Sequence, residues 1–272
     1  MYHRRIDLPT EGAYLETYFL DCSDRLRHSD SRPVILICPG GGYGYTTDRE
    51  AEPLALAFAS RGYHAAVLRY PCAPARFPTA LVSLGQAVLW IRANAARFHI
   101  DPSRLCVSGF SAGGHLAASL GVFWHEDFLT QLLGCQAEDI RPQALLLGYP
   151  VITDGDAGAH YTLVNLLGEE ASAEDFAYHS LENHVSDKTP PTFLWSTDTD
   201  ELVPIESTLV FAMALNRAGV SKEVHIYSVG EHGLGLSNAV TEDTLPGKAR
   251  VCPDCEGWID LAARWLRRQF GV

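Results

Sequence analysis

The stretch "LCVSGFSAGGHLAASL", residues 105–120, places a serine between a strand-like run and a helix-like run. Gly109 and Gly113 stand two positions before and after Ser111, in the pattern Gly-x-Ser-x-Gly. A strand, a sharp turn and a helix in this order would strain the serine backbone and expose its hydroxyl at the end of a sheet. The alternative is a tight turn whose serine caps a helix. The rest of the chain has to decide between a nucleophile and a cap.

Short apolar runs alternate along the chain with segments of helical character. Strands are predicted over residues 34–38, 65–69, 105–109, 144–148, 192–196 and 224–228, and helices over 49–62, 77–98, 203–220 and 257–270. Nearly continuous apolar strands suit a parallel sheet that is covered on both faces. The sequence therefore predicts a single α/β domain, with a mostly parallel twisted sheet and helices on both faces.

Two segments depart from this alternation. Residues 13–20 are expected to add an antiparallel edge strand. About forty residues separate the strand ending near Gly148 from the strand starting near Thr192, far more than a plain connection needs. We interpret residues 150–190 as a small lid insertion over the strand ends.

Composition and charge exclude several classes of partner. The chain has 272 residues and a formal net charge of −12, which disfavours nucleic acid and anionic membranes because both require clustered basic residues. Neither a signal peptide nor a transmembrane stretch is predicted. We expect a cytoplasmic protein with a small-molecule substrate and leave a homo-oligomer open.

The seven cysteines are interpreted as reduced thiols, in keeping with a cytoplasmic protein. Cys38 and Cys106 lie inside apolar runs and are expected in the core. Cys252 and Cys255 form a single CxxC pair without a second pair. Because a structural zinc site usually needs four ligands, free thiols are favoured over a metal site. No metal or cofactor is expected.

A glycine-rich segment, "PGGGY" at residues 39–43, directly follows the first predicted strand. Consecutive glycines let backbone N–H groups approach a reacting carbonyl, so Gly41 and Gly42 are candidate oxyanion donors together with Ala112, and Tyr43 is an alternative donor. A phosphate loop is excluded because no Gly-Lys-Ser/Thr follows, and Tyr45 stands where a dinucleotide fingerprint needs its third glycine. A plain flexible loop remains the alternative.

An elbow serine needs an acid and then a histidine later in the chain. His232 lies in the glycine-flanked segment "GEHGLGL", just past a predicted strand, whereas His225 alternates with apolar residues inside that strand. His232 is therefore the candidate base. Asp198, Asp200 and Glu201 all follow the preceding strand and compete as the acid.

With these parts in order, the chain resembles the α/β-hydrolases from about residue 30 to its end. It is most similar to acetyl esterases and acetylxylan-esterase-like carbohydrate esterases, which are related to hormone-sensitive-lipase-like esterases. The matching stretches are "PGGGY", "GYHAAVLRYP", "DPSRLCVSGFSAGGHLAASL", "YPVIT", "PPTFLWSTDTDELVPIEST" and "EHGLGL". The resemblance implies Ser111 as nucleophile, Asp200 as acid and His232 as base, with Gly41, Gly42 and Ala112 as the oxyanion hole.

The chain departs from its relatives at two places. Pro39 stands where lipase-like relatives have a histidine, and Ser196-Thr197 stands where many members have His-Thr. The resemblance implies a serine carboxylesterase that hydrolyses short acyl esters, in particular acetyl esters of sugars or xylo-oligosaccharides. Tyr43 and Tyr149, together with Tyr45 and Trp124, are expected to form a stacking surface for the substrate. The alternatives are a serine peptidase, a lipase-like hydrolase and a non-catalytic binding protein of the same fold.

Overall fold

The computed structural model describes residues 1–155, 157–244 and 250–271. Within them the strands form one sheet in the order β1-β2-β4-β3-β5-β6-β7-β8. Their bounds are β1 Tyr2–Asp7, β2 Tyr14–Phe19, β3 Arg32–Cys38, β4 His64–Arg69, β5 Ile100–Phe110, β6 Ala144–Gly148, β7 Thr192–Thr197 and β8 Lys222–Tyr227. The strands from β3 to β8 are parallel, and β1 and β2 pair antiparallel at one side. The predicted mostly parallel sheet is confirmed.

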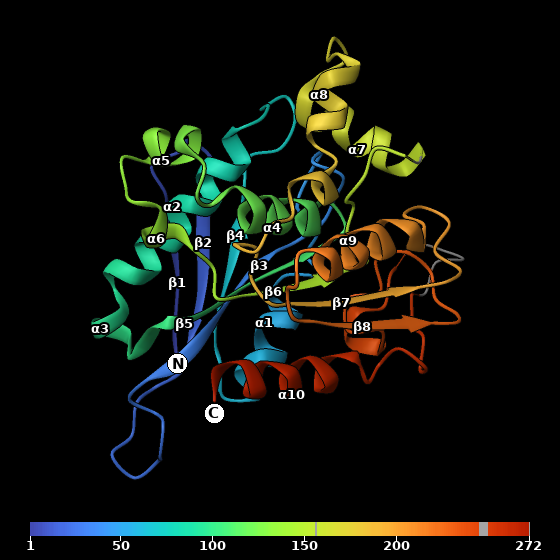
Figure 1. The fold of residues 1–272 in the computed structure, drawn as a ribbon. Helices are drawn as coiled ribbons and strands as arrows, with labels where there is room; N and C mark the ends of the chain where they lie inside the picture. Colours follow the sequence, from blue (N-terminus) through green and yellow to red (C-terminus); the bar gives the residue numbers. More distant parts are fainter. Residues whose placement is uncertain (156, 245–249, 272) are drawn as a thin grey trace.

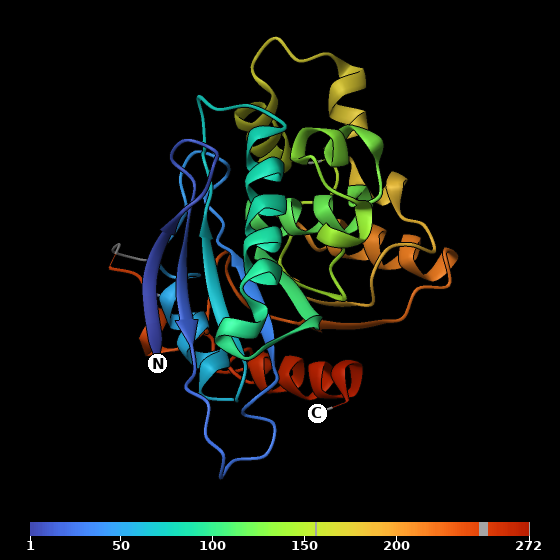
Figure 2. The ribbon, with the colours of Figure 1, turned by 90° about the vertical axis from the view of Figure 1, so that its left-hand side faces the viewer.

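Helices cover both faces of the twisted sheet (Figures 1 and 2). The bounds are α1 Glu52–Ala59, α2 Thr79–Ala93, α3 Ala95–Phe98, α4 Ala112–Phe123, α5 Asp127–Leu133, α6 Ala137–Ile140, α9 Ile205–Arg217 and α10 Trp258–Phe270. One face packs on α2, α4 and α9, and the other packs on α1 and α10. The central strands are almost fully buried between these two layers, as their continuous apolar sequences predict.

The amino-terminal strands correct one prediction. β2 is antiparallel, as expected, but it is not the edge strand, because β1 pairs with its outer side. β1 has the sequence "YHRRID" and is largely exposed. An exposed edge strand does not need an apolar run, so the apolar pattern that revealed the other strands was missing here.

The helix predicted over residues 77–98 is two helices, because α2 ends at Ala93 and α3 begins at Ala95. The side chain of Asn94 donates a hydrogen bond to the carbonyl of Trp90 at 2.8 Å. Asparagine competes in this way with the backbone hydrogen bonds that would continue a helix. The apolar spacing runs through the break and therefore did not reveal it.

The segment over residues 150–190 forms α7 Ala157–Leu167, α8 Ala173–Tyr178 and the short 3-10 helix η1 Leu181–His184. α7 and α8 project above the sheet in Figure 1. Tyr161 and Thr162 of α7 line the same cavity as Ser111, which follows β5. The insertion therefore forms part of the cavity wall at the carboxyl ends of the strands, where open α/β sheets place their ligands.

The cysteines lie in the described parts of the chain as free thiols. Cys38 and Cys106 are fully buried, as expected, and burial raises the pKa of both thiols. The sulfur atoms of Cys252 and Cys255 lie 3.4 Å apart, and both contact the carbonyl of Val229. The CxxC segment thus packs beneath the loop that carries His232.

Candidate active site

Ser111 occupies a strained turn between β5 and α4. Its φ of 55° and ψ of −124° are rare for a residue with a side chain. A Cβ atom on Gly109 would lie 2.0 Å from the carbonyl oxygen of Gly113, and one on Gly113 would lie 2.0 Å from that of Cys38. Both glycines are therefore required by close packing around the serine. This geometry matches the elbow predicted from the Gly-x-Ser-x-Gly pattern.

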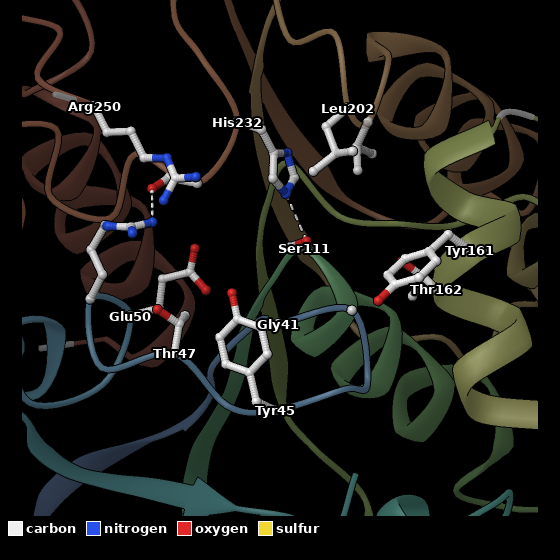
Figure 3. A pocket seen from close by; sticks show the side chains of 14 residues that line it. Gly41, Tyr45, Thr47, Glu50, Ser111, Tyr161, Thr162, Leu202, His232 and Arg250 are labelled. Atoms are coloured by element: carbon white, nitrogen blue, oxygen red, sulfur yellow. Dashed lines mark hydrogen bonds between the residues drawn. The ribbon is translucent and has the colours of Figure 1, made fainter. Parts of the chain in front are cut away.

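His232 contacts both Ser111 and an acid, and Figure 3 shows its contact with Ser111. The Oγ of Ser111 donates to Nε2 of His232 at 2.7 Å, and Nδ1 of His232 donates to Oδ2 of Asp200 at 2.7 Å. These partners fix the histidine tautomer with its proton on Nδ1. Asp200 follows β7 and His232 follows β8, so the three side chains come from the ends of three strands. The arrangement can accept a proton from the serine hydroxyl.

The carboxylate of Asp200 is fully buried and held on both oxygens. Its Oδ1 accepts the backbone N–H groups of Leu202 at 3.0 Å and Val203 at 2.9 Å. Val203 packs in turn with Ala159 of the insertion. Asp198 is exposed, and its backbone N–H donates to Tyr227 of β8. Of the competing acids, Asp200 is the one whose carboxylate contacts His232.

His225, the other histidine in this region, lies within β8 and points elsewhere. Its Nε2 lies 3.0 Å from the carboxylate of Glu223, and its ring packs against Phe193 of the neighbouring strand. This position agrees with its expected role as a strand side chain.

Gly41 and Gly42 lie beside Ser111 in the cavity wall and adopt φ values of 129° and 62°. The carbonyl of Gly41 accepts the N–H of Gly44, and the carbonyl of Gly42 accepts the side-chain amide of Asn165 from α7. No hydrogen bond within the described part of the chain occupies the N–H of Gly41 or Gly42. Ala112 begins α4, and the first N–H groups of a helix have no partner inside it. These N–H groups therefore remain available to a ligand.

A cavity of about 310 Å³ opens in front of Ser111. Its lining residues come from the glycine-rich loop and the turn after it, the elbow, the insertion and the loops after β7 and β8: Gly41, Gly42, Tyr45, Thr47, Arg49, Glu50, Ser111, Tyr161, Thr162, Leu202, Val203, His232, Gly233 and Arg250. Tyr45 and Tyr161 are 66 % and 64 % exposed, respectively. Large aromatic side chains thus stand at the mouth of the cavity, close to the serine (Figure 3).

One wall of the cavity is charged. Arg49 and Arg250 both donate to Oδ2 of Asp243, at 2.7 and 2.6 Å. Arg49 also donates to the carbonyl of Gly233, the residue after His232. All three charged side chains of this cluster are at most 19 % exposed. The cluster ties the turn before α1 to the loop that carries the histidine.

Tyr43 and Tyr149 were predicted to contact the substrate, but the structure buries both side chains away from the cavity. Tyr43 is 2 % exposed, and its hydroxyl lies 3.0 Å from Nδ1 of His115, whose pKa is lowered to about 3 by burial. Tyr149 is 1 % exposed, and its hydroxyl donates to Glu50. Trp124 is also buried, and its indole N–H donates to Lys188. None of the three lines the cavity, because all three rings are buried in the core.

Several cavity residues were not predicted. Tyr161 and Thr162 belong to α7 in the polar insertion, which lies outside the regular alternation of strands and helices that guided the prediction. Glu50 was counted only as part of a predicted helix, although it lies in the turn before α1. These residues are brought to the cavity by the folding of separate segments, and no local pattern in the sequence marks them.

In the part of the chain that the structure describes, His, Cys, Asp and Glu side chains do not gather in groups of three or more that could hold a metal ion. No helix among residues 1–155, 157–244 and 250–271 is both long and apolar enough to cross a membrane.

The chain is similar in sequence to known proteins. A family model described as BD-FAE matches residues 20–215. In sequence, 219 residues are 36 % identical to endo-1,4-beta-xylanase B of Butyrivibrio fibrisolvens, covering 78 % of this chain and 34 % of the xylanase. The chain spans about a third to a half of the length of its first sequence relatives.

Solved structures match over nearly the whole chain. The acetyl ester-xyloside bifunctional hydrolase from Caldicellulosiruptor lactoaceticus is 36 % identical with a TM-score of 0.79, covering 95 % of this chain and 88 % of that one. Carboxylesterase Cest-2923 from Lactobacillus plantarum is 30 % identical with a TM-score of 0.84, covering 99 % and 97 %. The chain therefore belongs to the BD-FAE family, has the α/β-hydrolase fold and resembles the acetyl- and xylan-esterase-like group.

Proposed function

We propose that the protein hydrolyses short-chain acyl esters, with Ser111 as nucleophile, His232 as base and Asp200 as the acid that orients the base. The observation that carries the proposal is the continuous hydrogen-bonded relay of two 2.7 Å contacts through His232. As Oγ of Ser111 attacks the ester carbonyl carbon, Nε2 of His232 takes the hydroxyl proton and then passes it to the leaving alcohol. Water repeats the attack on the acyl-enzyme and restores the serine.

The negative charge that develops on the carbonyl oxygen needs hydrogen-bond donors. In the proposed mechanism these are the backbone N–H groups of Gly41, Gly42 and Ala112. The free N–H groups of the glycine-rich loop support this role, as does the position of Ala112 at the positive end of the helix dipole of α4. Donors fixed in advance around a developing oxyanion supply one of the largest single contributions to such a reaction.

For the substrate, we propose acetyl esters of sugars such as xylo-oligosaccharides. A cavity of about 310 Å³ suits a short acyl group. The exposed rings of Tyr45 and Tyr161 at its mouth offer apolar faces on which a sugar ring packs. The similarity to an acetyl ester-xyloside bifunctional hydrolase supports the same substrate class.

Turnover of p-nitrophenyl acetate, butyrate and octanoate by the unmodified protein and by Ser111→Ala tests the chemistry. We expect acetate to be preferred and the Ser111→Ala variant to lose about a thousandfold or more in kcat. Ser119→Ala is the matched control, since Ser119 is a buried serine of α4, the helix that follows Ser111, and its hydroxyl donates to the carbonyl of His115. Turnover that persists in Ser111→Ala would overturn the proposal. Release of acetate from acetylated xylo-oligosaccharides tests the alcohol side.

A further inference from the structure

We propose that Glu50 is a positioning residue that fixes the glycine loop, residues 39–43, relative to the histidine loop, residues 228–236. It acts through Gly40 and through the hydroxyl of Tyr149. The consequence for rate rests on the proposed ester hydrolysis, whereas the geometric role can be tested without it.

The first carboxylate oxygen of Glu50 holds the start of the glycine loop. Glu50 is 1 % exposed, and its Oε2 accepts the N–H of Gly40 at 2.7 Å. The carbonyl of Gly40 accepts the N–H of Thr47 at 2.9 Å. Both polar atoms of Gly40 are thus fixed. The carbonyl of Gly40 and the N–H of Gly41 belong to the same planar peptide group, so fixing the carbonyl also fixes the direction of this N–H. The N–H of Gly42 follows one peptide group later.

The second oxygen reaches the histidine loop through one hydroxyl. Oε1 of Glu50 accepts the hydroxyl of Tyr149 at 2.7 Å, and the same hydroxyl oxygen accepts the N–H of Gly235 at 3.0 Å. Burial, with a further contribution from Glu50, raises the pKa of Tyr149 well above its ordinary value, so the hydroxyl keeps the proton that it donates. The ring of Tyr149 also packs edge-on against His232, with the ring centres 5.1 Å apart.

The packing around Gly40 leaves little room for an alternative arrangement. A Cβ atom there would lie 2.8 Å from each of Oε2 of Glu50, the carbonyl oxygen of Phe110 and Cβ of Ser111. The glycine loop is therefore pressed between the carboxylate and the nucleophile. A buried carboxylate is costly unless its oxygens are paired. Here one oxygen holds Gly40 of the glycine loop, and the other holds Tyr149, whose hydroxyl in turn holds Gly235 of the histidine loop. Glu50 thus affects the reaction through its neighbours rather than through the substrate.

Glu50→Gln and Tyr149→Phe test this role. In glutamine an N–H₂ group replaces one of the two oxygens and cannot accept a hydrogen bond, so either Gly40 or Tyr149 loses its acceptor, and phenylalanine removes the link to Gly235. We expect kcat for p-nitrophenyl acetate to fall about tenfold to a hundredfold in each variant, as small misplacements near a reacting centre do, with KM changed less than about threefold.

The chain offers a matched pair of controls. The hydroxyl of Tyr18 donates to the carboxylate of Glu52 at 3.2 Å, and neither residue lines the cavity. Glu52→Gln and Tyr18→Phe therefore remove the same kind of contact outside the site, and we expect both to keep kcat within about twofold.

Two readouts separate positioning from a general loss of packing. Sulfur accepts hydrogen bonds weakly, so a misformed oxyanion hole should slow a thionoester less than the matching oxygen ester. The rate of the oxygen ester divided by the rate of the thionoester should therefore fall in Glu50→Gln. In ¹⁵N-labelled protein, the backbone amide resonances of Gly40 and Gly41 should shift in Glu50→Gln and stay in place in Glu52→Gln, whether or not an ester is turned over.

The possible failures are distinguishable. Turnover that survives Ser111→Ala overturns the proposed function, and the amide resonances still decide the role of Glu50. Turnover that depends on Ser111 but is unchanged in Glu50→Gln and Tyr149→Phe overturns the positioning role alone. Equal losses for the thionoester and the oxygen ester, with unmoved amide resonances, overturn it as well.

Discussion

The two oxygens of Asp200 have separate partners: Oδ2 accepts from His232 at 2.7 Å, and Oδ1 accepts the N–H groups of Leu202 and Val203. The carboxylate is therefore clamped by its own loop and presents only one oxygen to the imidazole. Such an acid can hold the histidine in a single tautomer, which is the task the proposed mechanism gives it.

Replacing Asp200 by asparagine should remove the preference for the histidine tautomer that carries its proton on Nδ1. With the amide oxygen kept on the two backbone N–H groups, the amide N–H₂ faces Nδ1 of His232 and favours the tautomer that cannot take the serine proton. We expect Asp200→Asn to lower kcat by about 10³- to 10⁴-fold. The thermal unfolding midpoint should stay within a few degrees, because the loop contacts remain.

Asp198→Asn is the matched control for that measurement, since Asp198 is an exposed aspartate two positions earlier on the same loop. It should keep nearly full activity. A larger loss in Asp198→Asn than in Asp200→Asn would mean that the acid has been assigned to the wrong residue.

Tyr161 is expected to contribute to recognition of the alcohol portion. Its ring covers Gly42 at the cavity mouth and is 64 % exposed. Losing an aromatic contact of this kind costs about 1 kcal/mol, so Tyr161→Ala should raise KM for an acetylated xylo-oligosaccharide about fivefold, with less effect on p-nitrophenyl acetate.

The control for Tyr161→Ala is Tyr178→Ala, which removes another exposed tyrosine of the insertion that does not line the cavity. Steady-state kinetics on both substrates provide the measurement. An unchanged KM for the oligosaccharide in Tyr161→Ala would argue against stacking at this position.

His64 makes stability depend on pH. It is fully buried, and burial lowers its pKa to about 4, from 6.5 for an ordinary imidazole. Its Nδ1 accepts the N–H of Leu20, so the neutral ring is the form that fits. Between these two pKa values the unfolded chain binds the extra proton. The free energy of unfolding should therefore fall as the pH drops from about 6.5 to about 4, by at most about 1.4 kcal/mol per pH unit for this group.

Urea unfolding across that pH range tests the prediction with His64→Asn, whose side-chain oxygen can accept from Leu20. The variant should be less stable at pH 8 but should lose less stability on acidification. His28→Asn, at an exposed position, should follow the unmodified protein. The same pH slope in His64→Asn as in the unmodified chain would contradict this account.

The features that were predictable from the sequence are those with a local signal. Nearly continuous apolar runs revealed most of the strands from β3 to β7, an alternating pattern revealed β8, and fixed glycine spacing revealed the elbow of Ser111. β1 gave no such signal because an exposed edge strand needs no apolar run. The break at Asn94 depends on one side-chain hydrogen bond, which apolar spacing does not record.

Within the site, the missing information concerned the direction in which side chains point. Tyr43 and Tyr149 follow strands, as a substrate contact would, yet both turn into the core with positive φ values of 54° and 37°. Glu50 looked like an ordinary helix residue, because its partners Gly40 and Tyr149 are 10 and 99 positions away in sequence. Such contacts follow from the folded topology and not from any pattern nearby.

The insertion over residues 150–190 has a consequence for how this enzyme family can diversify. Its Tyr161 and Thr162 form the cavity wall, its Asn165 holds the carbonyl of Gly42, and its Ala159 packs on Val203, which holds Asp200. Exchanging this segment for that of a relative would therefore alter the substrate range and the reacting geometry in one event.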